Sequence, residues 1–439
     1  MKRLLLLTAA FGFVHAVGPA FADCAPDSIA SGETATCTGV DNDGFSDGSS
    51  DITVNVQAGA TVNSAPGDDA IDIDDDDTVL NNSGTLNADD DGVQGGDGFT
   101  LVNNGTINAG DDGVNVEGRS NVNLINNGTI NSVDRGVHMD DDAGGGLNNV
   151  LVNTGSIVST TGEGVEGGDF NTVTNAAGAL IQGYDDALQV GQNATITNHG
   201  TIRSNGIPGD PQDGIDIDSG SIVNGATGRI LSDLDAAIDF DESAIASTID
   251  NAGEIAGETG IMVETDPAEA NTAAQIVINR TGATIEGRAG IALLLGAGMD
   301  SLTNEAGGTI LGSTLFGDDD DQMTLLGDYS GRFGGSGAVF DGGTGTDAVT
   351  FVDYAFSQIA GVSLITDGFA LSLDNGNGMF DIALTGWESF IFAGGDTRGA
   401  ADLRGLASAA VPLPAGLVLL LSGIGGLAAL RRRRGVQAA

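Results

Sequence analysis

Residues 101–116 read LVNNGTINAGDDGVNV. Three short apolar segments lie in this stretch, and Asn, Gly or Asp residues separate them. Apolar and polar residues alternate along each segment, as they do in β-strands that bury one face. Asn and Gly favour the tight corners between such strands. The stretch therefore predicts three short strands joined by tight corners.

The same pattern recurs along the chain with a mean period of about 25 residues, which is typical of solenoids. Its core is an Asn, a spacer, a Gly, a small residue and then Ile or Leu. Copies begin at Asn82, Asn104, Asn127, Asn153, Asn175, Asn198, Asn224, Asn251, Asn279 and Asn304, after a degenerate copy at 59–62. No segment sustains the 3.6-residue spacing of a helix, so a helical repeat is excluded. We predict an all-β fold, a parallel β-helix of about 11 coils over residues 51–313.

The recurrent Asn predicts a side-chain ladder in which each amide bonds to its equivalent one coil away. The expected members are Asn104, Asn127, Asn153, Asn175 and Asn198. Asn104 and Asn127 also begin glycosylation sequons, which leaves glycan attachment as the alternative.

The composition is strongly acidic, with 62 Asp and Glu against 15 Lys and Arg and a formal net charge of −47. Six of the basic residues lie at the two ends of the chain, so the body is more acidic still. This charge excludes nucleic acid and anionic membrane surfaces as electrostatic partners. Because 40% of the residues are hydrophobic, the chain is not a disordered acidic segment.

Acidic pairs recur at one place in neighbouring coils, notably Asp90-Asp91 and Asp111-Asp112. Coils in such a fold stack about 4.8 Å apart. Carboxylates at that spacing repel by roughly 1 kcal/mol even in bulk water. They should therefore splay apart or recruit cations, and their hard oxygens suit Ca²⁺. The alternative is a solvated acidic edge that keeps the solenoid soluble.

A second candidate metal site lies at 342–351, GGTGTDAVTF. This segment resembles the RTX nonapeptide GGxGxDxUx, which occurs in tandem copies, whereas this chain has one clear copy. The resemblance implies Ca²⁺ binding by Asp341, Gly343, Gly345 and Asp347.

The N-terminus predicts export. Residues 1–22 combine a basic start, an apolar run and the small-residue site Ala20-Phe21-Ala22, as in a secretory signal peptide. Residues 23–50 should form an N-terminal cap. In an exported protein, Cys24 and Cys37 most simply form a disulfide, and two free thiols are the alternative. A zinc site is disfavoured, because no His lies nearby to complete the metal shell.

The C-terminus predicts membrane sorting. Val411-Pro412-Leu413-Pro414-Ala415 begins segment 411–439, and an apolar span over 413–430 ends at Arg431 to Arg434. The span has the minimum length for a transmembrane helix, and the arginines favour its cytoplasmic end. A buried core helix is the weaker alternative. The segment resembles the VPLPA variant of PEP-CTERM sorting signals. The resemblance implies a Gram-negative exporter, an inner-membrane precursor, an exosortase-type sorting enzyme, and display at the cell surface or in the matrix.

Between these parts, residues 314–400 should form a β-rich cap and 401–410 a linker. Residues 387–392 and the segments before them loosely resemble the end of autotransporter passenger β-helices. Too few residues follow for a membrane barrel.

These features favour a structural or adhesive protein at the cell surface or in extracellular polysaccharide, without enzymatic activity. The alternative is a Ca²⁺-dependent polysaccharide lyase or hydrolase, since parallel β-helices also carry such enzymes. The repeats contain scattered arginines, His138 and His199, but no recognisable catalytic motif and few aromatic residues.

Overall fold

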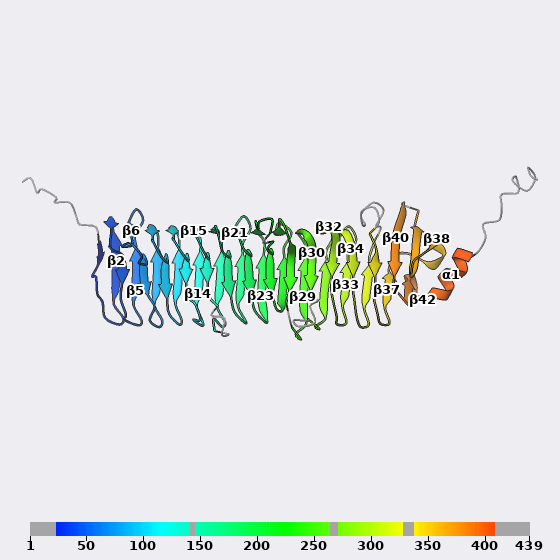
Figure 1. Ribbon diagram of the computed structural model, residues 1–439, viewed down its shortest axis with the longest axis horizontal. Coiled ribbons are helices and arrows are strands. Elements are labelled where there is room, and N and C mark those ends of the chain that lie inside the picture. Colours follow the sequence, from blue (N-terminus) through cyan, green and yellow to red (C-terminus); the bar gives the residue numbers. More distant parts are fainter. Residues whose placement is uncertain are drawn as a thin grey trace, which may run out of the picture.

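The computed structural model describes residues 23–140, 145–209, 211–241, 243–263, 271–327, 338–376 and 378–408. They form a straight rod, a parallel β-solenoid of about 12 turns (Figure 1). Most turns have three short strands, as the repeat predicts, and each of these strands pairs in parallel with its equivalent in the next turn.

The strands form three columns along the rod. The first column is β2 (Thr34–Thr38), β5 (Thr53–Val56), β8 (Val79–Asn82), β11 (Thr100–Asn103), β14 (Asn123–Asn126), β17 (Val150–Asn153), β20 (Thr172–Asn175), β23 (Ala194–Asn198), β26 (Gly220–Asn224), β29 (Ser247–Asn251), β31 (Gln275–Asn279), β33 (Ser301–Asn304), β35 (Gln322–Leu325), β37 (Ala348–Phe351) and β41 (Ser389–Phe392). The second is β3 (Val40–Asp41), β6 (Thr61–Asn63), β9 (Thr85–Asn87), β12 (Thr106–Asn108), β15 (Thr129–Ser132), β18 (Ser156–Ser159), β21 (Leu180–Gly183), β24 (Thr201–Ser204) and β27 (Arg229–Ser232). The third is β4 (Phe45–Ser46), β7 (Ile71–Ile73), β10 (Val93–Gly95), β13 (Val114–Asn115), β16 (Val137–His138), β19 (Val165–Gly167), β22 (Leu188–Val190), β25 (Ile215–Ile217) and β28 (Ala236–Phe240). Further along, β30 (Glu254–Val263), β32 (Thr284–Leu294) and β34 (Thr309–Leu315) span both of these columns, and β36 (Phe340–Asp341) follows β34.

The core is a set of aligned apolar side chains inside the coils. In the second column one inward position is Ile in nine successive turns, each no more than 1% exposed. Its members are Ile107, Ile130, Ile157, Ile181, Ile202, Ile230, Ile255, Ile285 and Ile310. Burying one such side chain contributes about 1.5–3 kcal/mol. Each repeated Ile is thus buried in its own coil and aligned with the equivalent Ile of the neighbouring coils.

An asparagine ladder closes the first column, but its register differs from the prediction. Its members are Asn82, Asn103, Asn126, Asn153, Asn175, Asn198, Asn224, Asn251, Asn279 and Asn304. Each Nδ2 donates to the next Oδ1 over 2.7 to 2.9 Å.

Asn153, Asn175 and Asn198 belong to this ladder, as predicted. Asn104 and Asn127 bond to each other across adjacent coils, as predicted, but they lie outside the buried ladder, in which Asn103 and Asn126 take their place. In each Asn-Asn-Gly corner the first Asn ends the strand and points inward, whereas the second lies on the exposed corner. Asn127 donates instead to its exposed neighbour Asn104.

The parallel stack extends past both predicted boundaries. At the N-terminal end β2 already pairs with β5, and at the other end β35, β37 and β41 continue the first column. The region predicted as a separate cap over 314–400 is thus partly solenoid, because its strands keep the register although its sequence loses the Asn-x-Gly signature.

Antiparallel strands cover both ends of the stack. Strand β1 (Asp23–Ala25) pairs with β2, and β42 (Asp396–Gly399) pairs with β41. A meander of β38 (Ile359–Ile365), β39 (Gly368–Asp374) and β40 (Met379–Thr385) and the helix α1 (Ala400–Ser408) complete the C-terminal end. Two short 3-10 turns lie here, η1 (Phe356–Gln358) and η2 (Ala393–Gly395).

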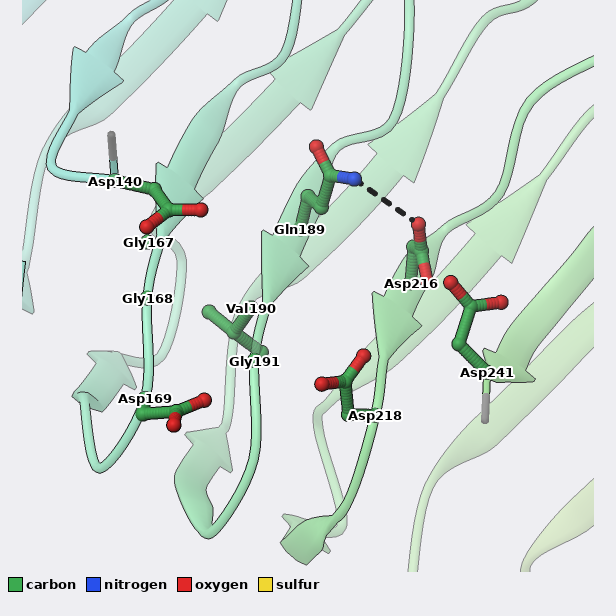
Figure 2. Close-up of a pocket in the computed structure, with 10 residues that line it drawn as sticks. All are labelled: Asp140, Gly167, Gly168, Asp169, Gln189, Val190, Gly191, Asp216, Asp218 and Asp241. Atoms are coloured by element: carbon green, nitrogen blue, oxygen red, sulfur yellow. Dashed lines mark hydrogen bonds between the residues drawn. The ribbon is translucent and has the colours of Figure 1, made fainter. Parts of the chain in front are cut away.

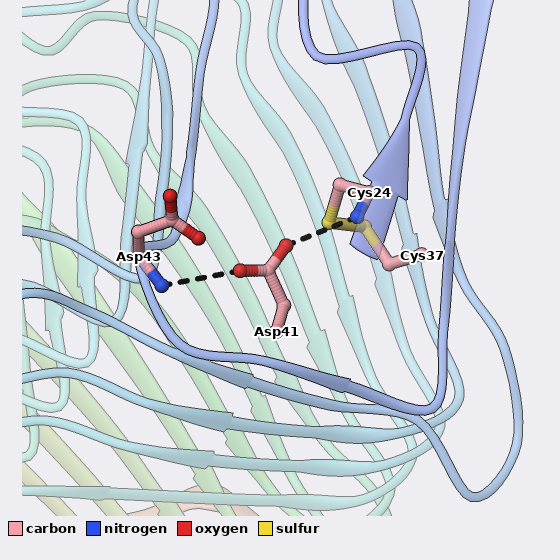
Figure 3. Close-up of a disulfide and its surroundings, with 4 residues drawn as sticks. All are labelled: Cys24, Cys37, Asp41 and Asp43. Atoms are coloured by element: carbon pink, nitrogen blue, oxygen red, sulfur yellow. Dashed lines mark hydrogen bonds between the residues drawn. A yellow bond between two sulfur atoms is a disulfide. The ribbon is translucent and has the colours of Figure 1, made fainter. Parts of the chain in front are cut away.

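Cys24 and Cys37 are direct partners across β1 and β2 and form a disulfide (Figure 3). The backbone N–H of Cys24 donates to Asp41 Oδ2 over 3.0 Å, which joins the N-terminal strand to the first coil. The disulfide alternative, rather than two free thiols, is the one that the structure contains.

No helix in the described part of the chain has the length and apolar character needed to cross a bilayer. The predicted signal peptide at 1–22 and the segment 411–439, with Val411, Pro412, Leu413, Pro414 and Ala415, lie outside the described residues.

Candidate cation sites on the acidic edge

The acidic pairs lie at one corner of the rod, just before the third-column strands. We call this corner the acidic edge. Its repeated members are Asp69, Asp91, Asp112, Asp186 and Asp213, and it also includes Asp90, Asp111 and Asp134 beside them. A carboxylate at this corner can accept a hydrogen bond from the backbone N–H of the equivalent residue in the next coil. The distances are 3.0 Å from Asp91 N to Asp69 Oδ1 and 3.0 Å from Asp112 N to Asp91 Oδ1. These acids therefore have a structural role that their sequence pattern did not reveal.

Burial raises the pKa of several of these carboxyls. For Asp91 it outweighs the hydrogen bonds from Asn115 and from the Asp112 backbone and raises the pKa to about 7. Burial likewise raises the pKa of Asp186 to about 7 and that of Asp69 to about 6. Neighbouring Asp residues add to the effect in each case. A positive charge at this edge would stabilise the charged carboxylates, which burial and neighbouring acids disfavour.

Two groups of three carboxylates on the edge have the geometry for a metal ion. They are Asp90, Asp91 and Asp111, and then Asp111, Asp112 and Asp134; in each group one oxygen per residue lies within 4.8 Å of the others. All four predicted edge residues, Asp90, Asp91, Asp111 and Asp112, belong to these groups, and Asp111 belongs to both. Oxygen-only ligand sets of this kind suit hard cations such as Ca²⁺.

A third group lies at the N-terminal end, where sequence reasoning had placed no metal. It consists of Asp23, Asp41 and Asp43. Asp41 is buried, and its Oδ1 accepts the backbone N–H of Asp43 over 3.1 Å (Figure 3). Asp23 is brought to Asp41 by the antiparallel pairing of β1, a contact that no sequence repeat announces.

The GGTGTD turn lies between β36 and β37, far along the rod from the edge groups. Gly343 and Gly345 have φ of 87° and 152°, and a residue with a side chain would be strained at these angles. Asp347 is fully buried, and Asp341 begins the turn with Oδ1 accepting the Gly343 N–H over 3.3 Å. The four predicted residues are thus near one another in a single turn, but they do not form one of the three-carboxylate groups found in the described residues.

An acidic hollow of about 170 Å³ lies on the outer surface further along the rod (Figure 2). Its lining includes Asp140, Asp169, Asp216, Asp218 and Asp241. Gln189 donates to Asp216 over 3.3 Å, and burial together with Asp241 raises the pKa of Asp216. The hollow is open and the carboxylates are spread around it, so it is a region of negative potential rather than a coordination shell.

One cluster brings His and Arg together with acids. His138 Nδ1 lies 2.8 Å from Asp112 Oδ2, and its Nε2 lies 3.5 Å from Glu166 Oε2. Arg135 pairs with the same Glu166 and with Glu163. Burial disfavours protonation of His138, but the hydrogen bond and charge of Asp112 outweigh it and raise the pKa. His138 belongs to no motif in the sequence, because its partners come from the coils on either side.

The chain matches no family model, no curated protein and no solved structure. Function is accordingly inferred from the residues and their geometry.

Proposed function

We propose that this protein is an exported structural or adhesive rod that binds divalent cations along its acidic edge. The observation that carries the proposal is the pair of carboxylate groups centred on Asp111, which occupy successive coils. A cation bound there would still have ligand positions free for an oxygen of another molecule, since Ca²⁺ takes six to eight oxygens. Acidic polysaccharide in the extracellular matrix, or a second copy of the rod, supplies such oxygens.

Binding to an acidic polysaccharide tests this proposal directly. The full chain is incubated with polygalacturonate beads in EDTA, in Ca²⁺, and in NaCl of matched ionic strength. We expect retention in Ca²⁺ alone. Asp111→Asn removes a ligand from both groups and should reduce retention several-fold, whereas the control Asp76→Asn removes one exposed charge outside them. Equal retention of the two variants would contradict a role for the edge groups.

The surface location is part of the same proposal. It rests on the signal-peptide pattern and on the VPLPA-like segment with its basic end. We propose an inner-membrane precursor that an exosortase-type enzyme processes in a Gram-negative cell. Deleting Arg431 to Arg434 should leave unprocessed precursor and reduce the surface protein. Normal processing and display in the deletion strain would contradict this location.

The competing function is a polysaccharide lyase or hydrolase, and the observation in its favour is the cluster of His138, Arg135, Asp112 and Glu166. A Ca²⁺-dependent lyase needs a base beside acidic groups that hold the Ca²⁺, and the Ca²⁺ neutralises the substrate carboxylate. Here both ring nitrogens of His138 face carboxylates, so the imidazole is held as a partner of Asp112 and Glu166. Release of unsaturated sugars from polygalacturonate by the wild type, lost in His138→Gln, would favour the enzyme over the rod.

A further inference from the structure

A second column of polar side chains runs inside the rod, at the corner that precedes the first-column strands. Its members accept a backbone N–H from the preceding coil. Asn149 Oδ1 accepts from Val122 over 2.9 Å, and Asn171 Oδ1 accepts from Asn149 over 2.7 Å. Toward the C-terminal end the same position becomes acidic, at Asp300, Asp321 and Asp347. We call these three residues the inner Asp column.

The inner Asp column keeps the hydrogen bond of the neutral members. Asp300 Oδ1 accepts from Gln275 over 2.7 Å, Asp321 Oδ1 accepts from Asp300 over 2.7 Å, and Asp347 Oδ1 accepts from Asp321 over 2.8 Å. The carboxylate of Glu388 then accepts from Asp347 over 2.8 Å. The column is therefore continuous over four coils, and each Oδ1 accepts a backbone N–H.

The second oxygen of each Asp is different. In Asn149 the corresponding group is an Nδ2 that donates to the carbonyls of Arg119 and Gly146, over 2.8 and 3.0 Å. In the inner Asp column the Oδ2 atoms are buried and have no hydrogen-bond partner, and the residues are 1%, 1% and 0% exposed. An acceptor thus stands where the neutral column has a donor. A cation bound between the coils would satisfy three such oxygens and would compete with protons for them.

The surroundings supply no such charge in the described part of the chain. The charged neighbours of the column are further acids, namely Asp319, Asp320, Asp341 and Glu388. Burial and these neighbours raise the pKa of Asp300 to about 9, of Asp321 to about 7 and of Asp347 to about 6. Acidic groups thus surround the column at three successive levels.

The backbone beside the column is stacked as regularly as the side chains. Each column residue ends a tight five-residue turn. The second residues of these three turns, Ala297, Asp318 and Thr344, pair in parallel. Gly296, Gly317 and Gly343 all have left-handed φ, of 85°, 109° and 87°. A Cβ at Gly343 would lie 1.8 Å from the Gly317 carbonyl oxygen, so only Gly lets these turns approach. The three turns share the spacing Gly-x-x-x-Asp, so the stack places the three carboxylates at the same position of successive turns.

We propose that the inner Asp column binds divalent cations between adjacent coils, with Ca²⁺ the best match to its ligands. The proposed ligands are the unpartnered Oδ2 atoms of Asp300, Asp321 and Asp347, which recur in three successive coils. Carboxylate oxygens in irregular array suit Ca²⁺ better than Mg²⁺, which requires a near-ideal octahedron. This inference extends the proposed cation dependence to a separate, internal site that would stabilise the C-terminal coils rather than bridge to a partner.

The single tryptophan of the chain makes the site observable. Trp387 is 4% exposed, donates to the carbonyl of Phe340 over 2.9 Å, and directly precedes Glu388 at the end of the column. Tb³⁺ replaces Ca²⁺ at oxygen sites and luminesces when an excited indole lies close by. A Tb³⁺ ion in the column would be sensitised by Trp387, whereas one at the acidic edge lies many coils away.

The experiment uses the full chain stripped with EDTA, titrated with TbCl₃ under selective excitation of tryptophan, and then with CaCl₂ in competition. We expect sensitised luminescence that Ca²⁺ displaces and MgCl₂ at the same concentration leaves largely unchanged. The variant Asp300→Asn/Asp321→Asn/Asp347→Asn should lose at least tenfold in Tb³⁺ affinity. It should remain folded, because Asn already fills this column at 149 and 171. Circular dichroism checks that point.

A matched variant separates the two sites. Asp90→Asn/Asp111→Asn/Asp134→Asn removes the same number of charges from the acidic edge and should keep the luminescence. Absence of sensitised luminescence in the wild type, or its persistence in the folded column variant, would overturn the inner site. Either result leaves the polysaccharide test of the acidic edge unaffected, so the two proposals fail separately.

Discussion

At the scale of the residue, Asn126 and Asn127 make the sharpest contrast in the molecule. Asn126 is 1% exposed; it donates to Asn153 Oδ1 over 2.9 Å and accepts from Asn103 over 2.8 Å. Asn126→Ala removes both of these ladder bonds and the bond to the Ser156 carbonyl, at about 1–3 kcal/mol for each buried group that loses a partner. We expect a loss of about 2–5 kcal/mol in the free energy of unfolding, measured by urea denaturation.

The adjacent Asn127→Ala is the control. Its side chain is exposed, and surface substitutions usually change stability by no more than about 0.5 kcal/mol. A similar loss in both variants would mean that the ladder contributes no more than the corner. The sequence held the information for this register: the ladder Asn is separated from the corner Gly by one spacer, and in Asn-Asn-Gly only the first Asn fits.

A second consequence at this scale concerns pH. Burial raises the pKa of Asp186 to about 7, above its unfolded value near 4, and its carboxyl accepts the Asp213 N–H over 2.6 Å. The folded state therefore binds this proton more tightly than the unfolded state does. Stability is highest below pH 4 for this group and falls as the pH rises from about 4 to about 7.

Without divalent cations, the melting temperature should fall between pH 5 and pH 8. The fall should be smaller in Asp186→Asn, which does not titrate. A melting temperature that rises over this range would contradict the direction of the shift.

At the scale of the element, the corner after the first column depends on stacked glycines. A Cβ at Gly128 would lie 2.0 Å from the carbonyl oxygen of Gly105, and one at Gly155 would lie 2.0 Å from that of Gly128. Gly128→Ala must therefore push two coils apart, at about 1–3 kcal/mol or more, as in other overpacked sites. Thermal melting of the variant should show a clear decrease.

Gly405→Ala is the opposite case. Gly405 lies in α1, where a Cβ meets no atom within 4 Å. Alanine is the better helix former by about 1 kcal/mol, so this variant should be unchanged or slightly more stable. Destabilisation by Gly405→Ala and not by Gly128→Ala would contradict the packing described for the corner.

Some of the elements could be predicted from the sequence and others could not. The three strands per coil followed from alternation and corner residues, because each coil repeats the same local chemistry. The ends did not follow: β1, β42 and the β38–β40 meander pair antiparallel, and no repeat signals a pairing that occurs once. Asp300 and Asp321 escaped notice for a related reason, since Gly-x-x-x-Asp stands out only when the turns at 296, 317 and 343 are aligned by the stack.

At the scale of the whole molecule, the net charge of −47 opposes the compact rod. Ions that bind only the folded state stabilise it by RT ln(1 + [L]/Kd), about 2.7 kcal/mol at a hundredfold excess over Kd. We expect the melting temperature to rise more in CaCl₂ than in NaCl or MgCl₂ of equal ionic strength, and EDTA to reverse the rise. Equal effects of all three salts would show that they act by screening the acidic charges and not by specific binding of Ca²⁺.

The direction of the strands has a mechanical consequence. Every coil lies across the long axis, so the hydrogen bonds between coils lie along it and a pull on the two ends of the rod loads them one layer at a time. Each layer that peels away replaces a rise of about 4.8 Å with about 25 residues of free chain, roughly 80 Å when extended. If the rod tethers a cell, the tether would lengthen in steps under tension, from the ends inward. At the N-terminal end, the Cys24–Cys37 bond would keep β1 attached to β2 as the first coil unfolds.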